Sequence, residues 1–250
     1  MSKAIKECGF QPRFYRGWMK TEGLHSRRIT VYETDIQLIT DSLPDYGECE
    51  RKVSALRGEI QGYIKKDNAF LTTLEPLKVS PCAAPLVRRM ASAGQKAGVG
   101  PMAAVAGAIA EALGRYLLRK GGREVIVENG GDIFLAGRVE RRVGIFSGKG
   151  LPCWRDLAIK VSAKDMPLGI CTSSGTFGHS FSFGHADSAV ILAPDAALAD
   201  AVATAVCNRV GSRENMEEAL AFGRSIKGVS GIIIICGDKL ASWGKVELVS

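Results

Sequence analysis

Hydroxyl-bearing residues and glycines gather in one stretch of this sequence, from Gly169 to Asp187. The stretch holds two of the three histidines, His179 and His185, and a run formed by Thr172, Ser173, Ser174 and Gly175. Glycines let backbone N–H groups approach a ligand closely, and hydroxyls donate to phosphate or carboxylate oxygens. The stretch therefore predicts a loop that binds an anionic group. A hairpin loop whose hydroxyls bond their own backbone is the alternative.

His179 is the expected acid or base of this stretch, because glycine precedes it and an imidazole titrates near neutral pH. Cys171, directly before the hydroxyl run, offers a different chemistry. Neighbouring N–H donors and a His179 imidazolium would lower the pKa of the Cys171 thiol, which could then carry a sulfur atom as a persulfide. The alternative is a buried, inert cysteine that packs as a small apolar side chain.

Asp200 and Thr204 lie four residues apart in Ala199-Asp-Ala-Val-Ala-Thr-Ala. On a helix this spacing places both side chains on one face. A carboxylate and a hydroxyl are hard oxygen ligands that suit Mg²⁺ or Ca²⁺. The alternative is a solvent-facing aspartate beside a threonine that bonds back to its own helix.

The hydrophobic pattern indicates which elements position these residues. Strands are expected from Phe14 to Thr40, with one slip in the alternation between Ile29 and Ile39 that suggests a bulge. Asn129-Gly130-Gly131 between two β-branched runs predicts a hairpin, because Asn-Gly tolerates positive φ. Helices are expected near residues 53–64, 86–96, 101–117 and 214–222, and a further helix is expected to start at Pro194-Asp195. Because these helices fall between groups of strands, the pattern favours an α+β fold over a doubly wound sheet.

Length and composition are those of an ordinary globular chain, with 250 residues, 46% apolar content and 24% charge. We expect one domain over residues 1–250, divisible into lobes at 1–97 and 98–250, with the site in the second lobe. No apolar run is long enough to span a bilayer, and the N-terminus lacks the apolar core of a secretory signal. A cytoplasmic location is therefore expected, without a membrane partner.

The cysteine spacing and the net charge indicate which ligands and partners to expect. The seven scattered cysteines contain no Cys-x-x-Cys pair, which argues against a disulfide framework or a zinc site of ordinary spacing. The net charge of +7 mildly favours an anionic small molecule. The basic pairs are not interleaved with aromatic residues, so nucleic-acid binding is not expected.

The order of several motifs resembles that of a known family. Gly98-Val-Gly100, an alanine-rich helix, Gly130-Gly131-Asp132, the hydroxyl run and the helix Ala199–Ala205 follow one another. This order is similar to that of the ApbE superfamily, the FAD:protein FMN transferases, and in particular its short cytosolic branch. The resemblance covers about the last 160 residues, from Gly98 onward.

The resemblance implies an α+β fold related to the T-fold, with antiparallel or mixed sheets, packed helices and a site between two lobes. In ApbE proteins an aspartate and a threonine of the late helix bind Mg²⁺, which carries over to Asp200 and Thr204. The flavin nucleotide, FAD or FMN, borders the glycine hairpin and the hydroxyl run. The implied ligand contacts are Gly98, Gly100, Asn129, Gly130, Gly131, Asp132, Thr172, Ser173, Ser174 and Gly175.

In the transferase reaction of that family, Mg²⁺ would neutralise the pyrophosphate while a threonine hydroxyl of an acceptor protein attacks. This sequence differs from the family in two places. The stretch from Val105 to Glu111 has no lysine, and only Gly178–His185 stands where the family has a hairpin with a His-x-x-Asp-Pro segment. His179 would then occupy the place of that hairpin's histidine.

Three hypotheses follow from these residues. The first is a Mg²⁺-dependent protein that binds a flavin or another nucleotide diphosphate, as an FMN transferase or FAD hydrolase. The second is a cytosolic sulfur-assimilation protein that uses Cys171, and the third is a non-catalytic metabolite-binding protein on the same fold. A homo-oligomer is also expected, because ApbE-like folds expose sheet edges.

Overall fold

The computed structural model describes residues 16, 23–146, 154, 156–175 and 184–250. A large sheet of eight strands contains, in spatial order, β1 (His25–Val31), β2 (Thr34–Thr40), β3 (Val125–Asn129), β4 (Asp132–Ala136), β7 (Leu168–Ser173), β8 (Ser188–Ala193), β9 (Gly231–Cys236) and β10 (Lys239–Gly244). All neighbouring pairs in it are antiparallel. A small sheet contains β11 (Glu247–Val249), β6 (Ala158–Val161) and β5 (Arg141–Gly144).

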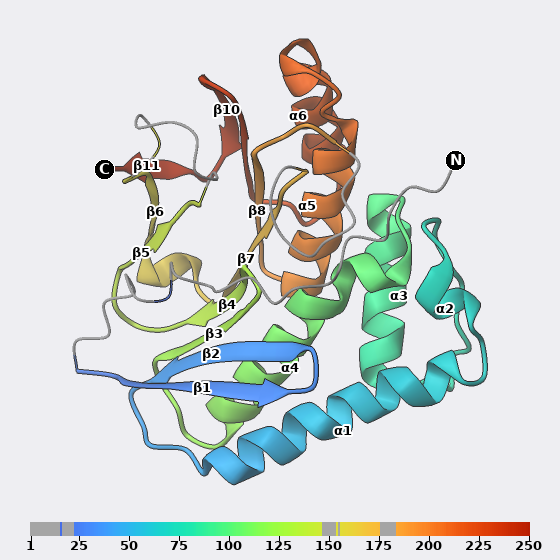
Figure 1. Cartoon of the computed structure of the whole chain (residues 1–250). Coiled ribbons are helices and arrows are strands. Elements are labelled where there is room, and N and C mark those ends of the chain that lie inside the picture. The colour runs from blue at the N-terminus through green and yellow to red at the C-terminus, as the bar shows by residue number, and fades with distance from the viewer. Residues whose placement is uncertain (1–15, 17–22, 147–153, 155, 176–183) are drawn as a thin grey trace.

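Helices cover one face of the large sheet, and the small sheet lies on the other side (Figure 1). The helices are α1 (Tyr46–Ile64), α2 (Ala69–Thr72), α3 (Pro85–Ala97), α4 (Val105–Arg119), α5 (Ala196–Arg209) and α6 (Met216–Ser225). This arrangement of helices and antiparallel sheets confirms the α+β fold.

Alternation along the strands divides the buried side chains into two cores. Phe134 and Cys171 face the helices, whereas their neighbours Leu135 and Ile170 face the small sheet. The central strands β7, β8 and β9 are therefore buried on both faces, and strand β9 is buried along its whole length. A functional side chain on one of these strands can point towards the helices or towards the small sheet. Which of the two it faces depends on whether it stands at an odd or an even position of the strand.

Helix α5 approaches the backbone of its neighbours unusually closely. A β-carbon at Gly107 of α4 would overlap the carbonyl of Ala196, and one at Gly169 of β7 would overlap the Cα of Ala196. Two glycines on different elements thus let the first turn of α5 lie directly on backbone. Asp195 caps this turn, as the sequence predicts, because its Oδ1 accepts the N–H of Leu198 at 3.0 Å.

A buried carboxylate also holds the start of α5. The Glu111 side chain is almost inaccessible to solvent, and its Oε2 accepts the N–H of Ala196 at 2.7 Å. Its Oε1 receives Arg89 at 2.6 Å and Arg115 at 2.5 Å. The two guanidinium groups compensate the buried charge, while the carboxylate satisfies an N–H that the helix itself cannot pair.

The structure corrects the expected bulge between Ile29 and Ile39. The slip in alternation is a two-residue turn at Tyr32 and Glu33, which joins β1 to β2 and pairs Val31 with Thr34. Tyr32 adopts a φ of 53°, a conformation that tyrosine rarely takes, so no turn signal is visible in the sequence.

Within the described part of the chain, no single helix is long and apolar enough to cross a membrane. Helix α3 and the helical segment Pro101–Arg119 would be long and apolar enough only if they were joined, and the angle between them is 105°.

Replacing Gly107 by alanine is expected to destabilise the protein by about 1–3 kcal/mol, because the added methyl group would push α5 away from α4. Gly58→Ala on α1 is the matched control, since a β-carbon there has no neighbour within 4 Å. The control is expected to gain about 0.5–1 kcal/mol from helix propensity. Urea denaturation measures both, and equal effects would contradict the close contact.

Candidate functional site

Two buried carboxylates, Asp132 and Asp200, come together on the helix-covered face of the large sheet. Asp132 is the first residue of β4, directly after the turn formed by Gly130 and Gly131, and Asp200 lies in the second turn of α5. Their exposed fractions are 6% and 9%, and the charge of Asp200 acts on Asp132. The structure therefore joins two motifs that are distant in the sequence.

Backbone N–H groups orient both carboxylates. Oδ1 of Asp132 accepts the N–H of Thr172 at 3.3 Å, and Oδ2 of Asp200 accepts the N–H of Gly107 at 2.9 Å. Asn129, at the other end of the turn, donates through Nδ2 to the carbonyl of Ala106 at 3.1 Å. The turn, strand β7, helix α4 and helix α5 are therefore connected around one point.

Burial has a large effect on the protonation of this pair. Burial raises the pKa of Asp200 to about 7, against the opposing effect of the Gly107 and Ala106 N–H groups. Burial, and then the charge of Asp200, raises the pKa of Asp132 well above its usual range. Among the described ion pairs, neither aspartate has a lysine or arginine partner. A cation would relieve this uncompensated negative charge.

Cys171 lies beneath the two aspartates and is fully buried, with its Sγ 3.3 Å from the carbonyl oxygen of Ala196. The expected lowering of its pKa is wrong for this environment. Burial raises the pKa of the thiol well above its usual value, and the charges of Asp132 and Asp200 raise it further. Because the thiolate is the reactive form, the structure does not favour the persulfide hypothesis.

The hydroxyl run does not form a loop along its whole length. Thr172 and Ser173 are the last residues of β7, so their side chains point to opposite faces of the sheet. Ser173 lies on the face of Cys171 and is 4% exposed, whereas Thr172 offers only its N–H to Asp132. Thr172 therefore turns its N–H and not its hydroxyl towards Asp132, and its contact with a ligand stays a prediction.

Three glycines assigned to the ligand have roles in backbone conformation or packing in the structure. Gly98 ends α3 with a φ of 73°, and the N–H of Gly100 donates to Leu74 at 2.8 Å. A β-carbon at Gly100 would overlap the carbonyl of Thr73, and one at Gly175 would overlap that of Gly184. These contacts explain the glycines without a ligand, whereas Gly130 and Gly131 form the turn beside Asp132, both at positive φ.

Of the remaining predicted site residues, Thr204 and Ser174 lie in the described part of the structure and His179 does not. Thr204 is half-buried one turn after Asp200 on α5, where the four-residue spacing places it on the same face. Ser174 follows the end of β7 and is half-buried. His179 lies outside the described residues, so its role as acid or base stays a prediction.

The donors at this point suit a hard divalent cation. Mg²⁺ in proteins is commonly held by one or two carboxylates, with water and phosphate oxygens in the other positions. Asp132, Asp200 and Thr204 offer two carboxylates and a hydroxyl, so these residues fit the ion. Within the described ranges, no group of three or more His, Cys, Asp or Glu side chains could hold a metal by itself. Such a site would need oxygens from the ligand to complete it.

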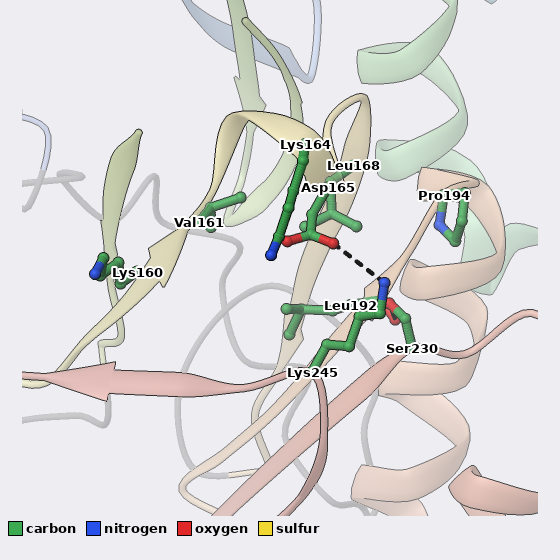
Figure 2. Close-up of a pocket in the computed structure, with 9 residues that line it drawn as sticks. All are labelled: Lys160, Val161, Lys164, Asp165, Leu168, Leu192, Pro194, Ser230 and Lys245. Atoms are coloured by element: carbon green, nitrogen blue, oxygen red, sulfur yellow. Dashed lines mark hydrogen bonds and ion pairs between the residues drawn. The ribbon is translucent and has the colours of Figure 1, made fainter. Parts of the chain in front are cut away.

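A separate cavity of about 170 Å³ lies near the small sheet (Figure 2). Leu168 and Leu192 line it, and both belong to the core on the far side of the sheet from Asp200. Of its lysines, Lys245 pairs with Asp165 at 3.1 Å, and Lys160 pairs with Glu247 at 2.9 Å. Because two of the three lysines that line it are paired with carboxylates, the cavity is a weaker candidate than the aspartate pair.

Sequence reasoning missed two residues that shape this site. Gly107 supplies an N–H to Asp200, and Glu111 fixes the start of α5. Glu111 is the one charged residue between Val105 and Gly114, and a lone acid in an apolar helix is a usable signal for a buried contact. Gly107 stands among alanines, where the sequence gives no hint of its partner.

Comparisons with known proteins support the resemblance. The chain is 39% identical over 234 residues to a UPF0280 protein of Methanocella arvoryzae, covering 92% of this chain and 94% of that protein. It is also 39% identical to a UPF0280 protein of Methanocaldococcus jannaschii, covering 89% and 92% of the two chains.

Two solved structures share the fold at low sequence identity. The flavin transferase ApbE from Vibrio cholerae matches with a TM-score of 0.58 and 15% identity, over 88% of this chain and 97% of that chain. The flavinyl transferase ApbE of Pseudomonas stutzeri, in its apo form, matches with a TM-score of 0.57 and 12% identity, over 89% and 95%.

A family model described as AbpE bacteria matches residues 16–248, which is nearly the whole chain. Together with its UPF0280 relatives and the ApbE structures, this match shows that the chain belongs to the AbpE bacteria family, an ApbE-like branch.

Proposed function

We propose that this protein binds the pyrophosphate of a flavin or another nucleotide diphosphate together with Mg²⁺, and that it cleaves or transfers the FMN half of FAD. One observation carries the proposal: two aspartates from distant motifs are buried side by side without a cationic side chain among the described ion pairs. Structural neighbours named as flavin transferases give the proposal its substrate class.

Asp200 and Thr204 would hold the ion on one face of α5, and Asp132 would face it from the hairpin. Mg²⁺ would neutralise pyrophosphate oxygens as the reaction proceeds. The N–H groups of Gly107 and Thr172 would keep the two carboxylates aimed at the same point, so that little reorganisation is needed when the ligand binds.

In the reaction, an oxygen nucleophile forms a bond to the FMN phosphorus, and the bond from that phosphorus to the bridging oxygen of AMP breaks. With water as nucleophile the products are FMN and AMP, and with a protein hydroxyl they are an FMN ester and AMP. His179 is the proposed acceptor of the nucleophile's proton, because an imidazole titrates near neutral pH.

Purified protein is expected to release AMP from FAD only in the presence of Mg²⁺. Asp200→Asn should weaken Mg²⁺ binding by at least about 10-fold, because it removes a charged ligand. Asp195→Asn is the control on the same helix, since asparagine caps a helix about as well as aspartate. Chromatography of AMP and FMN, with calorimetric titration of Mg²⁺, measures both effects.

A set of nucleotide diphosphates offered with Mg²⁺ decides between enzyme and binding protein. Binding of FAD without release of AMP, with or without an acceptor protein, would leave a metabolite-binding function. If the protein shows neither Mg²⁺-dependent binding nor turnover of any of them, the proposal is wrong.

The raised pKa of Asp200 makes the stability of the metal-free protein depend on pH. A carboxyl group whose pKa is higher in the folded state binds its proton more tightly there, so its contribution to stability is full below about pH 4 and is lost as pH rises through about 7. Urea denaturation in EDTA should show a smaller loss of stability between pH 5 and pH 8 in Asp200→Asn than in the wild type. An identical loss would contradict the burial of a titrating Asp200.

Thiol alkylation tests the sulfur hypothesis directly. Cys82 is exposed and Cys171 is buried, so one chain contains both the probe and its reference. We expect Cys171 to react with iodoacetamide at least about 10-fold more slowly than Cys82 at pH 8, because burial suppresses its thiolate. Mass spectrometry of timed samples measures both alkylation rates. If Cys171 is alkylated faster than Cys82, the persulfide hypothesis is supported again.

A further inference from the structure

The carboxylate of Glu128 fastens the glycine turn from the side opposite the helices. Glu128 lies on β3 between Val127, which faces the helix core, and Asn129, so its side chain points to the other face. Oε1 of Glu128 accepts the N–H of Gly131 at 2.8 Å. The side chain is 1% exposed, so this contact is made by a fully buried carboxylate.

Arg16 compensates that buried charge and also ties it to a neighbouring strand. Its Nε donates to Oε2 of Glu128 at 2.6 Å, and its two terminal nitrogens donate to the Asp35 side chain at 3.0 Å and the Asp35 carbonyl at 2.8 Å. The Arg16 side chain is only 10% exposed. One guanidinium thus spans β2 and β3 from a residue that lies outside both strands.

The turn needs such support because its own residues supply little. Gly130 and Gly131 have φ values of 74° and 101°, and neither has a side chain that could pack. Asn129 holds the turn to α4 on the helix side, and Glu128 holds it on the other side. Asp132 follows immediately, so the position of the turn sets the position of its carboxylate.

We propose that Arg16 is a positioning residue of the aspartate site: it holds Glu128 against the N–H of Gly131 and so fixes the carboxylate of Asp132 opposite Asp200. We call the chain of contacts from Arg16 through Glu128 to the Gly131 N–H the clamp, and the structure contains each of these contacts. The effect of the clamp on metal binding rests on the proposed function.

Arg28 provides a matched comparison, because it binds the same Asp35 carboxylate from β1, which is separated from β3 by β2. Its Nε and one terminal nitrogen donate to the Asp35 carboxylate at 2.7 and 3.0 Å, and its side chain is 50% exposed. If Arg16 served only to neutralise acidic residues, the loss of either arginine would have the same effect on the glycine turn.

The test compares Arg16→Gln with Arg28→Gln in the full-length protein. Exchange of the Gly131 amide with solvent, measured by NMR, reports the clamp, and titration with Mn²⁺ as a paramagnetic substitute for Mg²⁺ reports the site. We expect Arg16→Gln to speed Gly131 exchange and weaken Mn²⁺ binding, each by about 10-fold, with Arg28→Gln within twofold of the wild type.

Arg16→Lys keeps the charge but not the bidentate reach, so it should give an intermediate effect, and it replaces the glutamine variant if that one does not fold. Equal Gly131 exchange in the Arg16 and Arg28 variants would overturn the clamp. Faster exchange in the Arg16 variant, from a wild-type protein that binds no Mn²⁺, would support the clamp and contradict the proposed metal site.

Discussion

Helix α5 rests on bare backbone at its first turn, and the geometry of the site depends on that contact. Gly107 and Gly169 let the helix come close enough for the Gly107 N–H to reach the Asp200 carboxylate one turn further along. A methyl group at either glycine would increase the separation, and a hydrogen bond weakens steeply once its geometry is lost. Gly107 of α4 and Gly169 of β7 are therefore a requirement of the site as well as of packing.

The protein keeps this contact at a considerable electrostatic cost. Two carboxylates lie in a region from which water is excluded, and each is satisfied mainly by N–H groups that carry no net charge. Elsewhere the same fold compensates its buried acids: Glu111 has two arginines, and Glu128 and Asp35 share one. Among the residues that the structure describes, this contrast singles out Asp132 and Asp200, because a buried acid without a basic partner is rare unless it serves binding or catalysis.

Local patterns in the sequence predicted the elements of this fold well. Asn129-Gly130-Gly131 marked its hairpin, Asp195 marked the start of α5, and the four-residue spacing placed Asp200 and Thr204 on one face. Contacts between distant segments could not be predicted in the same way. Whether Thr172 faces the site depends on the register of β7.

Long-range partners were equally hidden from sequence reasoning. Glu128 binds Arg16, which is more than a hundred positions away in the sequence. No local sequence pattern near either residue predicts this ion pair. The turn at Tyr32 was hidden for a different reason, since its residues are not those that usually adopt positive φ. Local propensity therefore specified the elements, while tertiary packing decided which of their side chains meet.

The small sheet has a consequence for the order in which the molecule assembles. Strands β5 and β6 pair locally, but β6 finds its other neighbour in β11, after four strands of the large sheet have intervened. Closing so long a loop costs more chain entropy than forming the β1–β2, β3–β4 or β9–β10 hairpins. Docking of β11 should therefore be among the latest folding events, leaving the small-sheet core, including Ile159, exposed to water until that point.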